Sequence, residues 1–319
     1  MRIVVLDGYT LNPGDNPWDA VADQGDLEVH ERTPADQIVA RAAGAPIVLT
    51  NKTSLSADTI SQLPDLKFIS VLATGYNVVD VKAAQQRQIS VSNIPVYGTN
   101  TVAQHVFAVL LSMCHHPMLH DQAVRDGQWQ QHEGDFCFWN KPLLELVGKK
   151  MGVVGFGRIG RRVGEVANAF GMQVLAHDVF RGEDPTYQPF AWRSLPEVFA
   201  EADVVSLHCP QTDENAGFVN RELLNTMKSS AFFINAARGG LVTERDLADA
   251  LNEGKIAGAC IDVFSAEPIH DNNPLLQAKN CLLTPHIAWA TVSARRRLMA
   301  TTAENIAAFR KGDPINVVN

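Results

Sequence analysis

Short apolar runs alternate with amphipathic segments along the first hundred residues. The runs that predict β-strands lie at residues 3–6, around Val29, and at 47–50, 68–72 and 89–92. Segments with helical periodicity separate them, at 34–43, 57–63 and 80–88. Strands joined by helices of this length predict βαβ units and a parallel sheet.

The same alternation restarts at Met151. Strands are predicted at 153–154, 174–176, 204–207, 232–234, 257–263 and 282–283, with a helix at 158–170 that ends at Gly171. This pattern predicts a second doubly wound unit. At 319 residues the chain exceeds the size at which one core usually stops growing, which also favours two domains.

Two segments do not belong to the βαβ pattern. A long apolar helix is predicted at about 101–114, and the polar, aromatic-rich stretch 115–150 follows it, with Trp129 and Trp139. A loop this long is usually functional or an interaction arm. The last residues, 292–309, predict one amphipathic helix that could return to pack on the first domain.

Composition and charge exclude several classes of protein. The chain is 46% hydrophobic and 19% charged, as expected for a soluble globular enzyme, and carries a net charge of −8. Without a long basic run it offers no electrostatic footprint for nucleic acid. The five cysteines are scattered and include no CxxC pair, so we expect reduced thiols and no zinc site. With no signal peptide or apolar stretch of membrane length apparent, we expect a cytoplasmic protein that does not contact a membrane.

A glycine-rich loop opens the second unit at Gly155-Phe156-Gly157-Arg158-Ile159-Gly160. In this pattern the first glycine permits a tight turn, the second lets the backbone approach a pyrophosphate, and the third allows close helix packing. Asp178 ends the next predicted strand, where a carboxylate accepts hydrogen bonds from ribose hydroxyls and repels a 2′-phosphate. The loop and Asp178 therefore predict NAD binding. Arg158 and Arg181 leave weak NADP use open. The structural alternative to a dinucleotide site is an ordinary turn after the strand with an N-capping aspartate.

Four ionisable residues, Arg238, Asp262, Glu267 and His286, lie at or just past predicted strand ends. Because ligands bind at the carboxyl ends of parallel strands, we expect these residues to converge on one crevice. Arginine can bind a carboxylate through two parallel hydrogen bonds. A glutamate beside a histidine stabilises its protonated form and fixes its tautomer, so the ring can carry a proton near neutral pH. Taken singly, each residue could instead serve packing or capping.

The glycine loop, the Arg238 motif, Asp262 with Glu267-Pro268, and Pro285-His286 stand in an order that resembles the D-isomer-specific 2-hydroxyacid dehydrogenase family. The segments 71–80, 93–98 and 285–289 are most similar to its glycerate dehydrogenase and hydroxypyruvate reductase branch. The resemblance implies a flavodoxin-like substrate domain at 1–100 plus 291–319. It also implies a Rossmann NAD domain at 101–290, with the active-site cleft between the two.

The resemblance also implies a role for individual residues. Arg238 would bind the substrate carboxylate and carbonyl, His286 would be the acid/base, and Glu267 would orient it. The backbone of Thr74-Gly75 would bind the same carboxylate, unless this is an ordinary strand-to-helix turn. Further positions would line the cofactor: Gly155, Gly157, Arg158, Ile159, Gly160, Asp178, Cys209, Pro210, Ala236, Ala237 and Asp262.

Three features have a structural and a functional interpretation. The stretch 115–150 resembles the arm by which family members dimerise, which predicts a homodimer. Trp129 and Trp139 are then either anchors of the dimer interface or residues that pack within one chain. Trp289 either walls the pocket or packs in the core. The four histidines of this region are expected at a solvated helix end rather than at a metal: His105, His115, His116 and His120.

The predicted reaction is hydride transfer between NAD(H) and a small D-2-hydroxy acid or 2-oxo acid. Hydroxypyruvate to D-glycerate is the favoured pair, with glyoxylate to glycolate as a side activity. The alternatives are a D-lactate or D-3-phosphoglycerate dehydrogenase of the same family, an NAD-sensing corepressor-like binding protein, and a methyltransferase that uses the glycine loop for S-adenosylmethionine.

Overall fold

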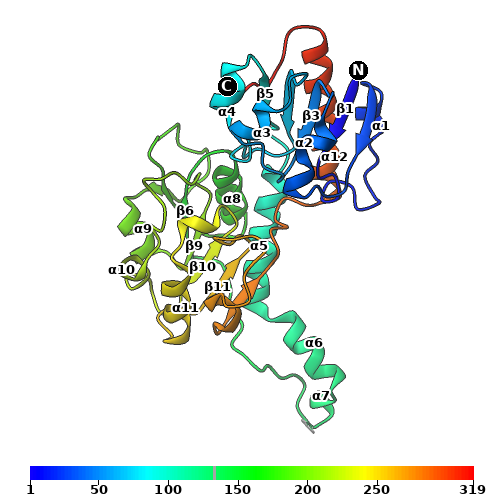
Figure 1. Ribbon diagram of the computed structural model, residues 1–319. Coiled ribbons are helices and arrows are strands. Elements are labelled where there is room, and N and C mark those ends of the chain that lie inside the picture. The colour runs from blue at the N-terminus through cyan, green and yellow to red at the C-terminus, as the bar shows by residue number, and fades with distance from the viewer. Residues whose placement is uncertain (132–133) are drawn as a thin grey trace. The chain divides into compact units, whose positions relative to one another are not determined.

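The chain folds into two α/β units. The computed structural model describes residues 1–131 and 134–319 (Figure 1). One unit comprises Met1–Gly98 with Ala290–Asn319, and the other comprises Thr99–Trp289. The boundaries expected from the sequence are 1–100 with 291–319 and 101–290.

The first unit contains a parallel five-stranded sheet in the order β2-β1-β3-β4-β5. This order matches the flavodoxin-like arrangement, as predicted. Its strands are β1 (Arg2–Val5), β2 (Asp26–Val29), β3 (Ile47–Thr50), β4 (Phe68–Val71) and β5 (Ser90–Ser92). Its helices are α1 (Asp19–Ala22), η1 (Ala35–Gln37), α2 (Ile38–Ala42), α3 (Ala57–Ser61), α4 (Val81–Gln86) and α12 (Val292–Arg310).

Helix α12 packs within this first unit although it comes from the far end of the chain. The ring of Phe309 stacks on that of Phe68 in β4, with centroids 4.6 Å apart. The buried guanidinium of Arg295 donates to Asp15 Oδ2 over 2.6 Å. After the helix, Val318 N–H donates to the carbonyl of Val91 in β5. The amphipathic pattern at 292–309 therefore reports burial against an N-terminal sheet.

The second unit contains a parallel seven-stranded sheet in the order β12-β11-β10-β9-β6-β7-β8. The strands are β6 (Lys150–Val154), β7 (Gln173–His177), β8 (Phe190–Trp192), β9 (Val204–Leu207), β10 (Phe232–Asn235), β11 (Gly258–Ile261) and β12 (Cys281–Leu283). The strand order reverses between β6 and β9, which is where ligands bind in open α/β sheets. The glycine-rich loop follows β6 at this point.

Helices cover both faces of the second sheet. They are α5 (Thr99–His115), α6 (Pro117–Arg125), α7 (Gln128–Gln131), α8 (Arg158–Ala169), α9 (Leu195–Glu201), α10 (Arg221–Leu224), η2 (Gly239–Leu241), α11 (Glu244–Asn252) and η3 (Pro274–Gln277). Successive strand residues enter different core clusters: Val153 packs with α5 and α8, and Val154 packs with α9 and α11. Parallel strands buried on both faces read as continuous apolar runs, which is why the sequence revealed them.

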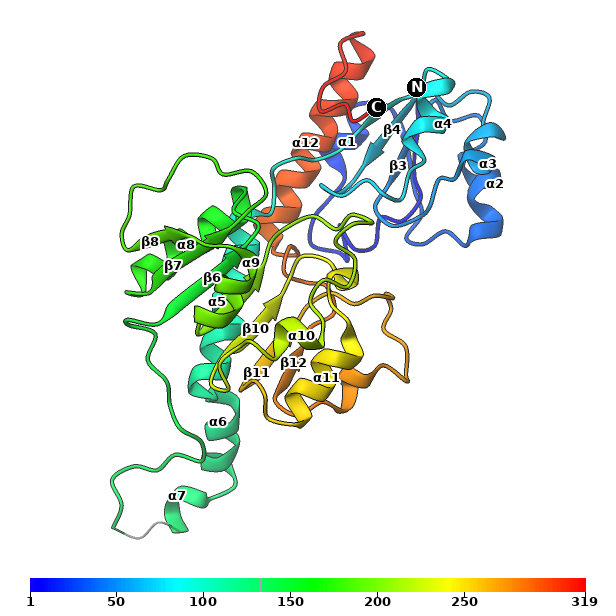
Figure 2. The same cartoon turned by 90° about the vertical axis from the view of Figure 1, so that its left-hand side faces the viewer.

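The stretch 115–150 differs from the predicted loop because it contains helices α6 and α7, which continue beyond the end of α5 (Figure 2). Proline at the first position of α6 is favourable because that position needs no hydrogen-bond donor. Residues 132 and 133 of the predicted arm lie outside the described residues. No helix in the described part of the chain is both long and apolar enough to span a membrane.

Candidate active site

The glycines of the glycine-rich loop allow a tight turn and a close approach of backbone segments. Gly155 has φ 92°, and a Cβ there would collide with the backbone of Cys209. A Cβ at Gly160 would collide with the Gly155 carbonyl, so this glycine lets α8 begin close to β6. At Gly157, however, a Cβ would meet no atom of the described chain within 4 Å. The space over Gly157, at the N-terminus of α8, therefore fits a phosphate group.

Asp178 follows β7 and lies against the same loop. Its Oδ2 accepts a hydrogen bond from Phe156 N–H over 2.6 Å, and Oδ1 accepts one from Phe180 N–H over 3.1 Å. The carboxylate is half-buried and negative beside the glycine cradle. These residues fit a dinucleotide whose ribose hydroxyls face a carboxylate.

The other predicted cofactor residues are distributed around this cradle. Arg158 and Ile159 begin α8, while Cys209-Pro210 and Ala236-Ala237 follow β9 and β10. Burial raises the pKa of the Cys209 thiol to about 11, so the thiol stays protonated at neutral pH. Cys209 therefore suits a wall of the site and is a poor nucleophile.

Arg238 is presented by a turn that Asn235 organises. The buried side chain of Asn235, at the end of β10, donates to the Arg238 carbonyl over 2.9 Å and accepts from Ala237 N–H over 3.1 Å. The exposed guanidinium donates through Nη1 to the Ala237 carbonyl over 2.7 Å. The sequence pattern gave no role to Asn235, because its partners are set by the turn geometry.

The Arg238 turn packs directly against the loop that carries Glu267. A Cβ on Gly239 would collide with the Phe264 carbonyl group and lie 2.5 Å from Ser265 N. Only a residue without a side chain allows this approach. The contact brings the Arg238 turn and the Glu267 loop into one place, as the strand-end pattern predicted.

His286 and Glu267 form a hydrogen-bonded pair. His286 Nδ1 lies 2.6 Å from Glu267 Oε2, and Glu267 Oε1 accepts from Phe264 N–H over 3.0 Å. The His286 side chain is 25% exposed, and no hydrogen bond to Nε2 is found within residues 1–131 and 134–319. A carboxylate on Nδ1 stabilises the imidazolium and leaves Nε2 for proton transfer.

The turn around His286 wraps the carboxylate of Asp262. His286 has φ 54°, which is unusual for a residue with a side chain, and its N–H donates to the Asp262 carbonyl over 2.8 Å. The Asp262 carboxylate is 1% exposed and accepts from Ile287 N–H and Ala288 N–H, each over 2.9 Å, and from Thr284 Oγ1 over 2.6 Å. Asp262 therefore holds the conformation in which His286 faces Glu267. The cofactor contact predicted for Asp262 stays a prediction.

His105 corrects one expectation from the sequence. Its side chain is 15% exposed, and Nε2 lies 3.8 Å from Asp262 Oδ1. It was expected at a solvated helix end, but its turn of α5 packs towards β11 and its neighbours. Burial lowers the pKa of His105, and that of His208 as well, so both rings are neutral at neutral pH. Among the described residues no group of three or more His, Cys, Asp or Glu could hold a metal ion.

Thr74 and Gly75 lie in the first unit, just past β4. Thr74 Oγ1 donates to the Ile94 carbonyl over 2.8 Å, and the Thr74 carbonyl accepts from Asn93 Nδ2 over 2.7 Å. The loop that follows β5 therefore fixes this turn. Substrate binding by its backbone remains a prediction.

Comparisons with known proteins agree on one family. The model of the D-isomer specific 2-hydroxyacid dehydrogenase NAD binding domain matches residues 107–288. A hydroxypyruvate reductase from Blautia hydrogenotrophica is 47% identical, over 100% of both chains. A glycerate dehydrogenase from Methylorubrum extorquens is 40% identical, over 89% of this chain and 88% of its own. The structure of an Aquifex aeolicus D-lactate dehydrogenase complexed with NAD and lactic acid superposes with a TM-score of 0.83 and 29% identity, covering 98% of this chain and 96% of that one.

Replacing Asp262 with asparagine should loosen the His286 turn. An amide keeps one acceptor oxygen and turns an NH2 group towards donors, so at least one buried donor loses its partner. We expect a loss of roughly 1–3 kcal/mol in the free energy of unfolding. Hydrogen exchange at the amides of Ile287 and Ala288 should also become faster.

Asp249→Asn is the matched control, because Asp249 pairs with the half-exposed Arg221 on the surface. It should change the unfolding free energy by less than about 0.5 kcal/mol. Unchanged exchange at both amides in Asp262→Asn would show that the carboxylate does not hold the turn.

Proposed function

Because this chain belongs to the D-isomer-specific 2-hydroxyacid dehydrogenase family, we propose that it reduces hydroxypyruvate to D-glycerate with NADH. Glyoxylate to glycolate is the proposed side reaction. The observation that carries the proposal is the 2.6 Å contact between His286 and Glu267, on a loop that packs against the Arg238 turn. The two relatives named for hydroxypyruvate and glycerate support this choice of substrate.

The proposed mechanism divides the work among three side chains. The Arg238 guanidinium binds the substrate carboxylate and polarises the C2 carbonyl. Protonated His286 donates its Nε2 proton to the carbonyl oxygen, while Glu267 stabilises the imidazolium through Nδ1. NADH, when bound, supplies the hydride that goes to C2. One hydride and one proton convert the 2-oxo acid into the 2-hydroxy acid.

Asp178 supports NADH as the preferred coenzyme. Its carboxylate stands beside the glycine loop, where it would repel the 2′-phosphate of NADPH. The guanidinium of Arg181 lies over the ring of Trp192, 5.9 Å from its centroid, so this cation has a partner other than a 2′-phosphate. The cytoplasmic location predicted from the sequence stays a prediction.

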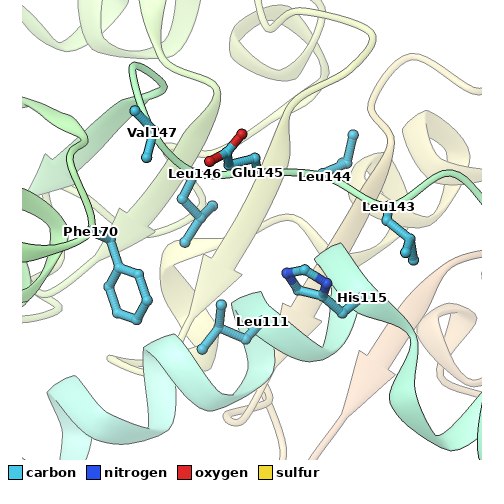
Figure 3. A pocket seen from close by; sticks show the side chains of 8 residues that line it. All are labelled: Leu111, His115, Leu143, Leu144, Glu145, Leu146, Val147 and Phe170. Carbon is cyan, nitrogen blue, oxygen red and sulfur yellow. The ribbon is translucent and has the colours of Figure 1, made fainter.

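A second copy of this chain is the proposed partner. Apolar side chains are exposed along the arm, with Met118, Phe136 and Trp139 at 76%, 92% and 63%. An apolar groove of about 460 Å³ lies between α5 and the segment 143–147 (Figure 3). Its lining includes Leu111 and Phe170. Apolar patches of this kind mark protein interfaces, and they agree with the family's dimerisation arm.

A substrate panel at fixed NADH tests the proposed reaction. We expect the highest kcat/KM with hydroxypyruvate, a lower value with glyoxylate, and the lowest with pyruvate. His286→Ala should lower kcat by about 10²–10⁴ with NADH affinity retained, because general acid catalysis contributes that order. A preference for pyruvate would favour a D-lactate dehydrogenase. Absence of turnover with every oxo acid, together with tight NADH binding, would favour the NAD-sensing binding protein.

Arg238→Lys tests substrate anchoring. Lysine retains the charge but lacks the planar fork, so both the carboxylate and the carbonyl contact should suffer. We expect kcat/KM for hydroxypyruvate to fall by about 10² or more, divided between KM and kcat. NADH binding, measured by tryptophan fluorescence quenching, should be retained. Intact oxo-acid kinetics would move the carboxylate site to the Thr74-Gly75 turn.

Leu143→Glu tests the homodimer. Leu143 lines the groove and is 52% exposed, so a charge there should be tolerated in one chain and unfavourable in a buried interface. Analytical ultracentrifugation should show a dimer for the parent and mostly monomer for the variant. Ile315→Glu, at a similarly exposed apolar position of the first unit, should leave the dimer intact. A monomeric parent would refute this assignment.

A further inference from the structure

We propose that Glu244 is a positioning residue for the acid/base pair, because it fixes the loop from which Glu267 reaches His286. This inference rests on the proposed function, which gives His286 and Glu267 their roles. Glu244 is the first residue of α11 and touches neither of them in the described contacts. Its effect on the reaction would pass entirely through the loop.

Glu244 holds the loop with both carboxylate oxygens. Oε1 accepts from Ser265 N–H over 2.8 Å, and Oε2 accepts from Ser265 Oγ over 2.8 Å and from Asn273 Nδ2 over 2.9 Å. All three donors are uncharged, and hydrogen bonds to a charged acceptor are the stronger kind. The position of Glu244 in the first turn of α11 further favours its negative charge.

The segment between the two donors is the one that carries Glu267. Ser265 stands two residues before Glu267, and Asn273 caps η3 by accepting from Leu275 N–H over 3.0 Å. One carboxylate therefore joins both ends of residues 265–273 to α11. Glu267 itself is 31% exposed, so burial of its own side chain does little to fix it.

Two further contacts make the position of Ser265 matter to the reaction. Gly239 packs on the backbone of Phe264 and Ser265, so this point of the loop also abuts the Arg238 turn. Phe264 N–H donates to Glu267 Oε1, which orients the second oxygen towards His286. A shift at Ser265 would therefore change both the Glu267–His286 distance and the placement of Arg238.

Glutamine at position 244 keeps the shape but cannot satisfy the same donors. Its single carbonyl oxygen can accept from one side, and its NH2 group would then oppose Ser265 or Asn273. The loop should shift, and the contact between Glu267 and His286 should weaken. A displaced Glu267 carboxylate no longer holds the His286 ring in place for proton transfer, so kcat should fall.

The experiment compares kcat and KM for hydroxypyruvate reduction, measured with the full chain at one pH. The variants are Glu244→Gln, Ser265→Ala, Glu267→Gln and the double variant Glu244→Gln/Glu267→Gln. Glu222→Gln is the matched control, because Glu222 is an exposed carboxylate in the first turn of the neighbouring helix α10. The dissociation constant of NADH and the melting temperature are measured for each variant.

We expect Glu244→Gln to lower kcat by about tenfold, with a smaller rise in KM for hydroxypyruvate from the displaced Arg238 turn. Ser265→Ala, which removes one donor, should lower kcat by less, and it carries the test if Glu244→Gln does not fold. The double variant should have the kcat of Glu267→Gln alone, because the effect of Glu244 on proton transfer passes through Glu267. NADH binding should stay within about twofold of the parent, and Glu222→Gln should match the parent.

A parental kcat in both Glu244→Gln and Ser265→Ala would overturn the inference, as would fully independent losses of kcat in the double variant. His286→Ala separates this failure from failure of the proposed function. If His286→Ala is inactive while Glu244→Gln has the parental kcat, only the positioning role is wrong. If His286→Ala retains parental turnover, the acid/base assignment is wrong, and the positioning role is wrong with it.

Discussion

The contact between Glu267 and His286 joins two loops that leave neighbouring strands, and the rest of the site is arranged so that this contact can form. The turn of His286 is wrapped around the buried carboxylate of Asp262. The loop of Glu267 lies against Gly239 on one side and Glu244 on the other. Neither residue of the pair is deeply buried, so hydrogen bonds from the surrounding backbone supply the precision that core packing supplies elsewhere.

The doubly wound sheets give these loops a common edge. Strands β10, β11 and β12 are adjacent and parallel, so the residues that follow them emerge side by side although they are far apart in sequence. The glycine loop follows β6, where the strand order reverses. Burial of the apolar strands determines the sheet, and the loops after its strands all leave at one edge. The proposed cofactor loop and the proposed proton donor therefore belong to one unit.

The central strands were predictable because parallel strands buried on both faces form unbroken apolar runs such as 47–50 and 204–207. Short elements with half-buried faces were missed, among them β8, α10 and α11. Helix α9 carried a local signal, since Ser194 and Glu197 form a capping box that the sequence displays. Helices α6 and α7 of the arm were not predicted. Most of their apolar side chains face solvent in one chain, so their sequences lack the apolar spacing of a helix that packs on a core.

The chemical residues were easier to predict than the residues that position them. Arg238, Asp262, Glu267 and His286 stand at strand ends within motifs and were found. The positioning contacts of Asp262 and of Glu244 join residues 21 to 29 positions apart, and these contacts were not predicted. No local pattern specifies such partners, because they depend on which loops the sheet brings together. The structure was needed to distinguish a carboxylate that holds a turn from one that faces a ligand.

A structure of the protein with NADH and oxamate, an unreactive analogue of a 2-oxo acid, tests the central claim most directly. The account predicts the oxamate carboxylate on the Arg238 guanidinium. It also predicts that the amide carbonyl oxygen of oxamate, which takes the place of the C2 carbonyl oxygen of a substrate, lies within hydrogen-bonding distance of His286 Nε2. His286 Nδ1 should still contact Glu267. Oxamate bound in contact with the cofactor but out of reach of both Arg238 and His286 would contradict the account.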